Sequence, residues 1–147
     1  MRRLAFAALV LALAGEAAAM AAGGMRTERV RFDRGTTGTT LRGHIDGYDA
    51  VRYVLGARRG QSTRMSLKAN NESAYFNVDA PRTGTTLFDG SVSGGEWEGR
   101  LPADGDYVVT VYLMRNAARR HESANYRLRI DIAPGRGGTT TDPHGGY

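Results

Sequence analysis

The sequence predicts an all-β fold, an antiparallel β-sandwich of about seven to nine short strands in a single domain. From residue 30 onward, short runs rich in β-branched and aromatic residues alternate apolar with polar side chains. This alternation is typical of strands with one buried and one solvent-facing side. Asp-Gly pairs at residues 46–47, 89–90 and 104–105 favour tight turns, because glycine accepts positive φ angles. No segment keeps a helical period.

Nine runs are expected to form the strands. They span residues 30–34, 39–45, 50–57, 64–69, 73–80, 85–92, 96–103, 106–114 and 125–133. If the last two runs pair as a hairpin, their connection extends from about residue 115 to residue 124, beyond the usual two to five residues.

The first 22 residues are predicted to be a secretory signal peptide. Two arginines precede an apolar run over residues 4–15, and small residues follow, with cleavage expected near residues 19–22. The apolar run is too short to remain as a membrane span, and no later stretch approaches eighteen apolar residues. We therefore expect an exported protein with no membrane insertion after cleavage.

The remaining chain divides into one folded domain and a tail. Residues 23–133 are long enough for one core of ordinary size, and they contain all nine expected strands. Residues 134–147 are dense in Gly and Thr, so we expect them to form a disordered tail.

Composition narrows the functional classes. The chain has no cysteine, which removes disulfides and thiolate chemistry. Its formal charge of +5 falls to +4 without Arg2, Arg3 and Glu16, and Lys68 is the sole lysine. In an exported protein this basic balance indicates an anionic protein surface, a wall polymer or lipid head groups rather than nucleic acid. Arginine suits bidentate carboxylate recognition, although a compositional bias of the source genome would produce the same excess.

Enzyme motifs are missing from the sequence, which has no G-x-S-x-G, H-E-x-x-H, P-loop or G-x-G-x-x-G pattern. His44 and Asp46 share a strand face and Asp49 lies close by, but a metal needs more ligands than this spacing supplies. We interpret the group as a solvated strand edge that leads into the turn at residues 46–47.

Glu96 and Glu98 share one strand face, and Trp97 between them faces the other way. Glycosidases place two carboxyl groups across a cleft, so this pair does not predict a catalytic site. We interpret Trp97 as a core residue. Because no catalytic set converges, we expect a protein that is not an enzyme and that needs neither a cofactor nor a metal.

The arginine-rich connection reads "RNAARRHESA" over residues 115–124. Long connections on a compact scaffold are often functional. Asn116 is a good N-cap, and residues 117–120 could form one helical turn, which would place Arg115 and Arg119 on one side. Like charges at that spacing cost a few tenths of a kcal/mol in isolation, and an anionic partner would reverse the sign. A solvated basic loop is the alternative.

Four segments resemble the periplasmic inhibitors of g-type lysozyme. They are "GYD" at 47–49, "LPADGDY" at 101–107, "RNAARR" at 115–120 and "NYRLRI" at 125–130. Their order and spacing agree from about residue 30 to residue 132, and the R-N-x-A-R-[KR] loop is the specific part.

The resemblance implies a periplasmic β-sandwich that protects peptidoglycan by binding the cleft of g-type lysozyme with loops at one end. It assigns cleft contacts to Tyr48, Arg115 and Arg119, with Asn116 shaping the loop. Arg120 completes the partner-binding set at a position where some relatives have lysine, and Ala117 stands where some have an acidic residue. Guanidinium forks could reach carboxylates inside the cleft, and a tyrosine adds an apolar face with a polar tip.

A secreted accessory module that binds glycan or cell wall without inhibitory activity is the alternative. In that case Trp97, Tyr48 and Tyr75 would form an exposed aromatic platform. A ring-lined flat face would indicate the module, and an arginine-tipped protrusion would indicate the inhibitor.

Overall fold

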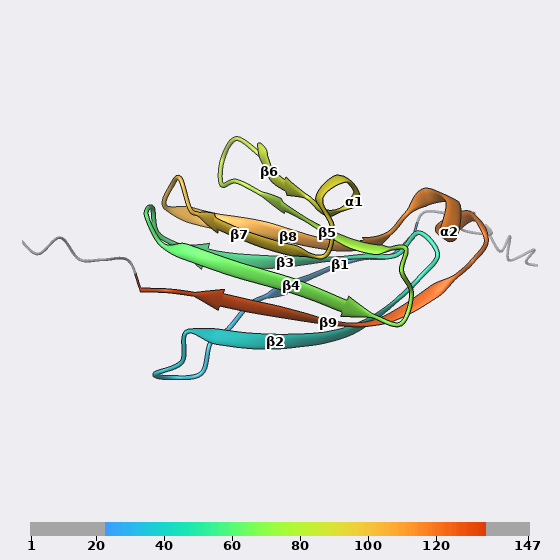
Figure 1. Cartoon of the computed structure of the whole chain (residues 1–147), viewed down its shortest axis with the longest axis horizontal. Coiled ribbons are helices and arrows are strands. Elements are labelled where there is room, and N and C mark those ends of the chain that lie inside the picture. The colour runs from blue at the N-terminus through green and yellow to red at the C-terminus, as the bar shows by residue number, and fades with distance from the viewer. Residues whose placement is uncertain (1–22, 135–147) are drawn as a thin grey trace, which may run out of the picture.

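The computed structural model describes residues 23–134, which form two facing β-sheets (Figure 1). The first sheet has the strand order β1-β3-β8-β5-β6 and the second has the order β2-β9-β4-β7. The strands are β1 (Met25–Arg29), β2 (Gly38–Asp46), β3 (Ala50–Ala57), β4 (Ser62–Ala69), β5 (Ala74–Asp79), β6 (Thr86–Asp89), β7 (Glu96–Arg100), β8 (Gly105–Leu113) and β9 (Ser123–Ile132). Two short helices, α1 (Gly90–Ser93) and α2 (Arg115–Arg119), lie in connections. The predicted all-β sandwich is confirmed.

The core lies between the two sheets and follows the period-two alternation of the sequence. In β9 every second side chain is buried, namely Ala124, Tyr126, Leu128, Ile130 and Ile132. The facing sheet contributes Val51, Leu55, Phe76, Val78, Val109 and Val111, which are all at most 1% exposed. Fully burying an aliphatic or aromatic side chain contributes roughly 1.5 to 3 kcal/mol, so this alternation fixes both the sheet faces and the register.

One edge strand escaped the sequence prediction. β1 is exposed along its whole length and pairs in parallel with β3, so it lacks the apolar alternation that marks the other strands. Residues 30–34, which were expected to be a strand, pass instead from one sheet to the other. Val30 is buried there, and its N–H donates to the Val54 carbonyl at 2.9 Å.

The expected strand over residues 85–92 is also wrong at its end. Asp89 accepts a hydrogen bond from the Ser91 N–H at 3.0 Å and so begins the single turn of α1. Gly90 is packed so closely that a Cβ there would lie 2.5 Å from the Phe76 carbonyl oxygen. The Asp-Gly pair therefore starts a helical turn here, whereas the pair at 46–47 forms the tight turn that was expected, with Gly47 at φ 54°.

The hairpin between the last two strands is not formed. β8 pairs with β3 and β5 in the first sheet, while β9 pairs with β2 and β4 in the second. The connection through α2 therefore crosses from one sheet to the other, which explains why it is longer than a hairpin loop.

The predicted signal peptide at residues 1–22 lies outside the described residues, and the predicted tail does too except for Pro134. Both stay predictions. Within residues 23–134, neither helix has the length or apolar character needed to cross a membrane.

Candidate functional site

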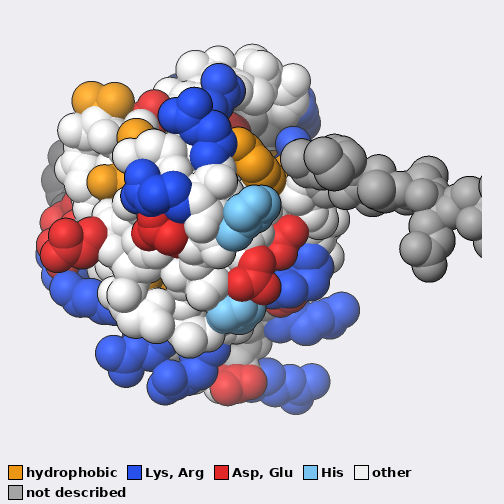
Figure 2. Space-filling model, turned by 90° about the vertical axis from the view of Figure 1, so that its right-hand side faces the viewer, with side chains coloured by type: hydrophobic (Ala, Val, Ile, Leu, Met, Phe, Trp, Pro, Cys, Tyr) orange, Lys and Arg blue, Asp and Glu red, His pale blue; other side chains and the backbone are white. Residues whose placement is uncertain are grey.

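Three connections meet at the α2 end of the sandwich, the end that Figure 2 views face-on. They join β2 to β3, β4 to β5, and β8 to β9. The backbone carbonyl of Glu122 accepts a hydrogen bond from Gly47 N–H at 2.8 Å. The Asn71 amide donates to the Glu122 carboxylate at 3.1 Å and to the Ser123 carbonyl at 3.0 Å. Glu122 therefore ties all three connections together.

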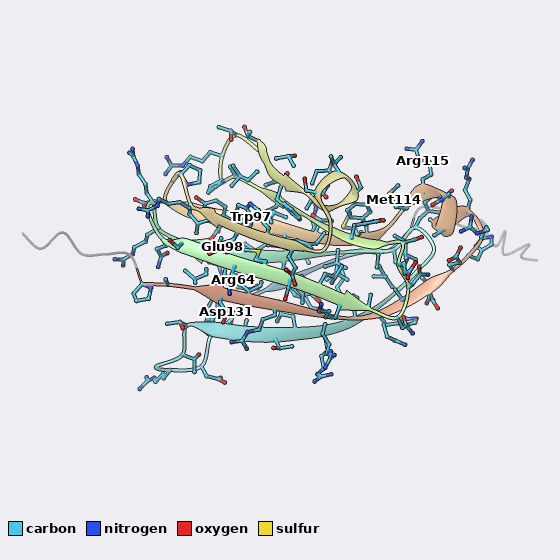
Figure 3. The ribbon with its side chains drawn as sticks, in the orientation of Figure 1. Arg64, Trp97, Glu98, Met114, Arg115 and Asp131 are labelled. Carbon is cyan, nitrogen blue, oxygen red and sulfur yellow. The ribbon has the colours of Figure 1, made fainter. Side chains whose placement is uncertain are left out.

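Helix α2 is held against this end by its two alanines. Ala117 and Ala118 are at most 1% exposed, whereas Arg115, Asn116 and Arg119 are exposed. A five-residue helix is unstable in isolation, so burial of these small side chains must hold it in place. The helical turn is confirmed and bounded by Arg115 and Arg119, four residues apart. The figure shows Arg115 pointing away from the ribbon (Figure 3).

The expected role of Asn116 as N-cap is wrong. The helix begins two residues earlier than expected, at Arg115, with Met114 in the N-cap position and no side-chain capping bond. Met114 is instead fixed through its backbone, because its N–H donates to the Ser73 carbonyl at 2.9 Å. The Asn116 side-chain oxygen accepts from the Ala117 N–H at 2.8 Å, so Asn116 shapes the first turn from within.

The arginines of this connection fall into two kinds. The guanidinium of Arg120 donates through Nε to Glu122 Oε2 at 2.7 Å, and its ion pair with Glu122 keeps it within the loop. Arg115 and Arg119 have no ion pair within residues 23–134. Their donors are therefore available to a partner, while Arg120 stabilises the loop that carries them.

Tyr48 lies in the turn beside α2 and is 41% exposed. The Asp49 N–H donates to the Asp46 carbonyl at 2.9 Å and closes this turn. Asp49 is fixed in its own right, because its carboxylate accepts the Gly24 N–H at 2.7 Å. An ideal Cβ on Gly47 would lie 3.6 Å from the Ala118 carbonyl oxygen, so the Tyr48 turn sits directly against α2.

His44 lies near the same end and donates through both ring nitrogens when it is protonated. Its Nδ1 lies 2.7 Å from Asn125 Oδ1, and its Nε2 lies 3.0 Å from Asp46 Oδ1. These two hydrogen bonds, Asn125 first, raise the pKa of His44. Within residues 23–134 no group of three His, Asp or Glu side chains is placed to hold a metal ion. His44 and Asp46 are exposed, as the sequence predicted for this strand edge, whereas Asp49 is partly buried.

The structure brings the predicted partner-binding residues to one end of the molecule: Tyr48, Arg115, Asn116, Arg119 and Arg120. Sequence reasoning missed Glu122 and Asn71, which tie the end together across 51 residues of chain. An adjacent pair of asparagines at 70–71 was the only local sign of a structured loop.

The aromatic residues of the alternative platform do not come together. Trp97 is half-buried and stacks on Phe88 between the sheets, with ring centroids 6.0 Å apart. Tyr75 lies on the first sheet beside Tyr112, and Tyr48 lies on the end turn. The interpretation of Trp97 as a core residue is confirmed to the extent that it packs against the core cluster.

Comparison with known proteins gives consistent relatives, although no protein-family model matches the chain. A curated protein of Escherichia coli (strain K12), named inhibitor of g-type lysozyme, is 31% identical over 110 residues, which are 70% of this chain and 78% of that protein. The crystal structure of Aeromonas hydrophila PliG, a periplasmic inhibitor of g-type lysozyme, matches with a TM-score of 0.69 and 35% identity, covering 76% of this chain and 100% of that one. The Salmonella Typhimurium PliG structure matches with a TM-score of 0.61 and 30% identity over 74% of this chain and 98% of that one.

The same sandwich also occurs in a different setting. The pre-peptidase C-terminal domain of a Bacillus anthracis collagenase has a TM-score of 0.52 at 15% identity over 74% of this chain and 96% of that one, a likeness of fold alone. The fold and the site define a small β-sandwich protein with exposed arginines and a tyrosine on the connections at one end. The chain belongs to the family of inhibitors of g-type lysozyme, and the resemblance seen in its sequence is confirmed.

Proposed function

We propose that this chain is an exported, periplasmic inhibitor that binds g-type lysozyme and protects peptidoglycan, and that it acts by binding rather than by catalysis. In this proposal α2 enters the active-site cleft with Arg115 and Arg119 leading. Tyr48 packs beside them, Asn116 shapes the helix, and Arg120 contributes at the rim of the contact.

The main support for the proposal is that the two leading arginines of α2 have guanidinium groups that are free within the described part of the chain. Arg115 and Arg119 are exposed, and neither has an ion pair within residues 23–134. A glycosidase cleft contains carboxyl groups, and guanidinium forks bind carboxylates with two parallel hydrogen bonds. Two exposed cations on one short helix therefore complement the charge of an acidic cleft.

The rigidity of the end supports the same function. Buried alanines hold α2, and Glu122 links it to the neighbouring connections. A loop that is already ordered loses little conformational entropy on binding, and this preorganisation raises affinity. Tyr48 adds the amphipathic kind of side chain that is common at the centre of protein interfaces.

The first experiment is a cell-wall lysis assay with purified g-type, c-type and i-type lysozymes and the mature chain. We expect inhibition of the g-type enzyme and much weaker inhibition of the other two. Absence of inhibition of all three would contradict the proposal and would favour the accessory module.

The second experiment replaces single arginines. Arg115→Ala or Arg119→Ala leaves a carboxylate of the enzyme unpaired in the cleft, which costs about 2 to 5 kcal/mol. Each 1.4 kcal/mol is about tenfold in affinity, so inhibition should weaken by more than an order of magnitude. Arg59→Ala is the matched control, because Arg59 is an exposed arginine at the opposite end of the sandwich. All three variants should melt like the wild type, and equal inhibition by all three would exclude α2 as the inhibitory element.

A further inference from the structure

The outer face of the β2-β9-β4-β7 sheet contains a row of three cations. Arg42 on β2 lies opposite Arg127 on β9, which in turn lies opposite Lys68 on β4. All three side chains are exposed. Like charges directly opposite one another on neighbouring strands destabilise a sheet, so this row has no obvious structural purpose.

Two other cations on this face, Arg129 and Arg64, are paired with carboxylates. Arg129 pairs with Asp131 at 2.6 Å, and Arg64 pairs with Glu98 at 3.1 Å. Figure 3 shows Arg64, Glu98 and Asp131 on neighbouring strands. Within residues 23–134, Arg42 and Arg127 have no such partner, and the Lys68 Nζ is 4.0 Å from Glu96, at the limit of an ion pair. The face is therefore locally unbalanced at this row.

The three cations line one hollow of about 530 Å³, together with Asn70 and Asn125. The side-chain oxygen of Asn70 accepts the backbone N–H of Asn125 at 2.9 Å, and the side-chain oxygen of Asn125 lies 2.7 Å from His44 Nδ1. Their amide NH₂ groups have no hydrogen bond within residues 23–134. Among the described residues, the side-chain groups of the hollow that remain free to bind a ligand are therefore three cations and two amide NH₂ groups, all of them hydrogen-bond donors.

We infer that this hollow is a binding site for a phosphate-bearing ligand. Arginine and lysine both bind phosphate, and arginine does so through a planar fork. A phosphate monoester carries close to two negative charges and three acceptor oxygens, which fits three cations and two amide donors better than a single carboxylate does. The shared chemistry is the phosphate group, whether it belongs to a lipid head group or to a soluble ligand. The site lies on a sheet face and does not depend on the inhibitory role of α2.

The test is calorimetric titration of the mature chain with inorganic pyrophosphate. In parallel the chain is titrated with phosphatidylcholine vesicles that contain or lack phosphatidic acid, whose head group is a phosphate monoester, at about 0.15 M salt to screen distant charges. We expect saturable binding that weakens about tenfold or more in Arg42→Gln and in Arg127→Gln. Arg100→Gln is the matched control, because Arg100 is an exposed arginine on β7 of the same sheet that does not line the hollow. Arg100→Gln should bind within about twofold of the wild type, because Arg100 lies outside the hollow. It loses the same single charge as the other two variants, so any effect of net charge alone would appear in all three.

The two probes distinguish the source of the phosphate. Vesicle binding that pyrophosphate displaces assigns the site to a lipid head group, and binding of pyrophosphate alone assigns it to a soluble ligand. Equal weakening in Arg100→Gln, or no saturable binding of either probe, overturns the inference. The melting temperature of Arg127→Gln shows whether weaker binding reflects loss of the folded state. We expect it to be no lower than that of the wild type, because the substitution removes one of three neighbouring like charges.

Discussion

The buried tyrosine pair allows a sharp test of the core. Tyr53 and Tyr126 come from opposite sheets and are 1% and 3% exposed, and their hydroxyl oxygens lie 2.6 Å apart. Burial, the largest cause, raises the pKa of both phenols, so both hydroxyls remain protonated. Within residues 23–134 no buried side-chain polar atom lacks a hydrogen-bond partner. Removing one hydroxyl therefore leaves the other buried without its partner.

The expected effect follows from that geometry. Tyr53→Phe or Tyr126→Phe alone should cost about 1 to 3 kcal/mol, because an unsatisfied buried hydroxyl loses its full hydration. For a domain of this size that is a fall in melting temperature of roughly 4 to 12 °C. The double variant should be less destabilised than the sum of the two, with a coupling of at least about 1 kcal/mol, since both polar groups are gone.

The assay is thermal and urea unfolding of the four proteins, monitored by circular dichroism. Simple addition of the two single effects, or single variants as stable as the wild type, would refute the assignment of this hydrogen bond to the core. Inhibition of lysozyme serves as the second measurement. It should stay unchanged in every variant that remains folded, because the pair is buried between the sheets and cannot contact the partner.

Two further predictions concern the α2 end. The pKa of His44 is raised in the folded chain, so the stabilisation that protonated His44 provides is present below the unfolded pKa of about 6.5 and is lost as pH rises through the folded pKa. NMR titration should show the raised pKa of His44, and Asp46→Asn should lower it. An unchanged pKa in Asp46→Asn would contradict the hydrogen bond between His44 and Asp46. A folded domain fused directly before Gly23 should weaken inhibition, because Gly24 is hydrogen-bonded to the turn that carries Tyr48. The same domain fused after Pro134, beyond the far end of β9, should leave inhibition unchanged. Equal effects of the two fusions in the lysis assay would contradict the proposal that the α2 end contacts lysozyme.

Sequence reasoning reached the parts of the fold that are encoded locally. β3 was predicted with its observed bounds, because its apolar alternation and its flanking turns lie within one short segment. β1 was missed because its exposed side chains carry no burial pattern, and its strand conformation comes from pairing with β3. The Asp89-Gly90 pair was misassigned for a related reason, since close packing of Gly90 on Phe76 selects a helical turn over a hairpin turn. Which strands share a sheet was equally out of reach, because only tertiary packing separates β8 from β9.

The candidate site shows the same division between local and tertiary information. The pattern R-N-A-A-R-R specifies a short helix with arginines on its exposed side, and the buried alanines show why small residues stand between them. A larger side chain at Ala117 or Ala118 would lift the helix from the end of the sandwich, since overpacking costs about 1 to 3 kcal/mol. Burial of the two alanines holds the helix against the sandwich. Glu122 fixes the connection that follows it, because its bonds to Gly47 and Asn71 join segments far apart in the chain. The exposed charges can therefore be read from the sequence, whereas the rigidity that makes them useful to a binding protein depends on the fold.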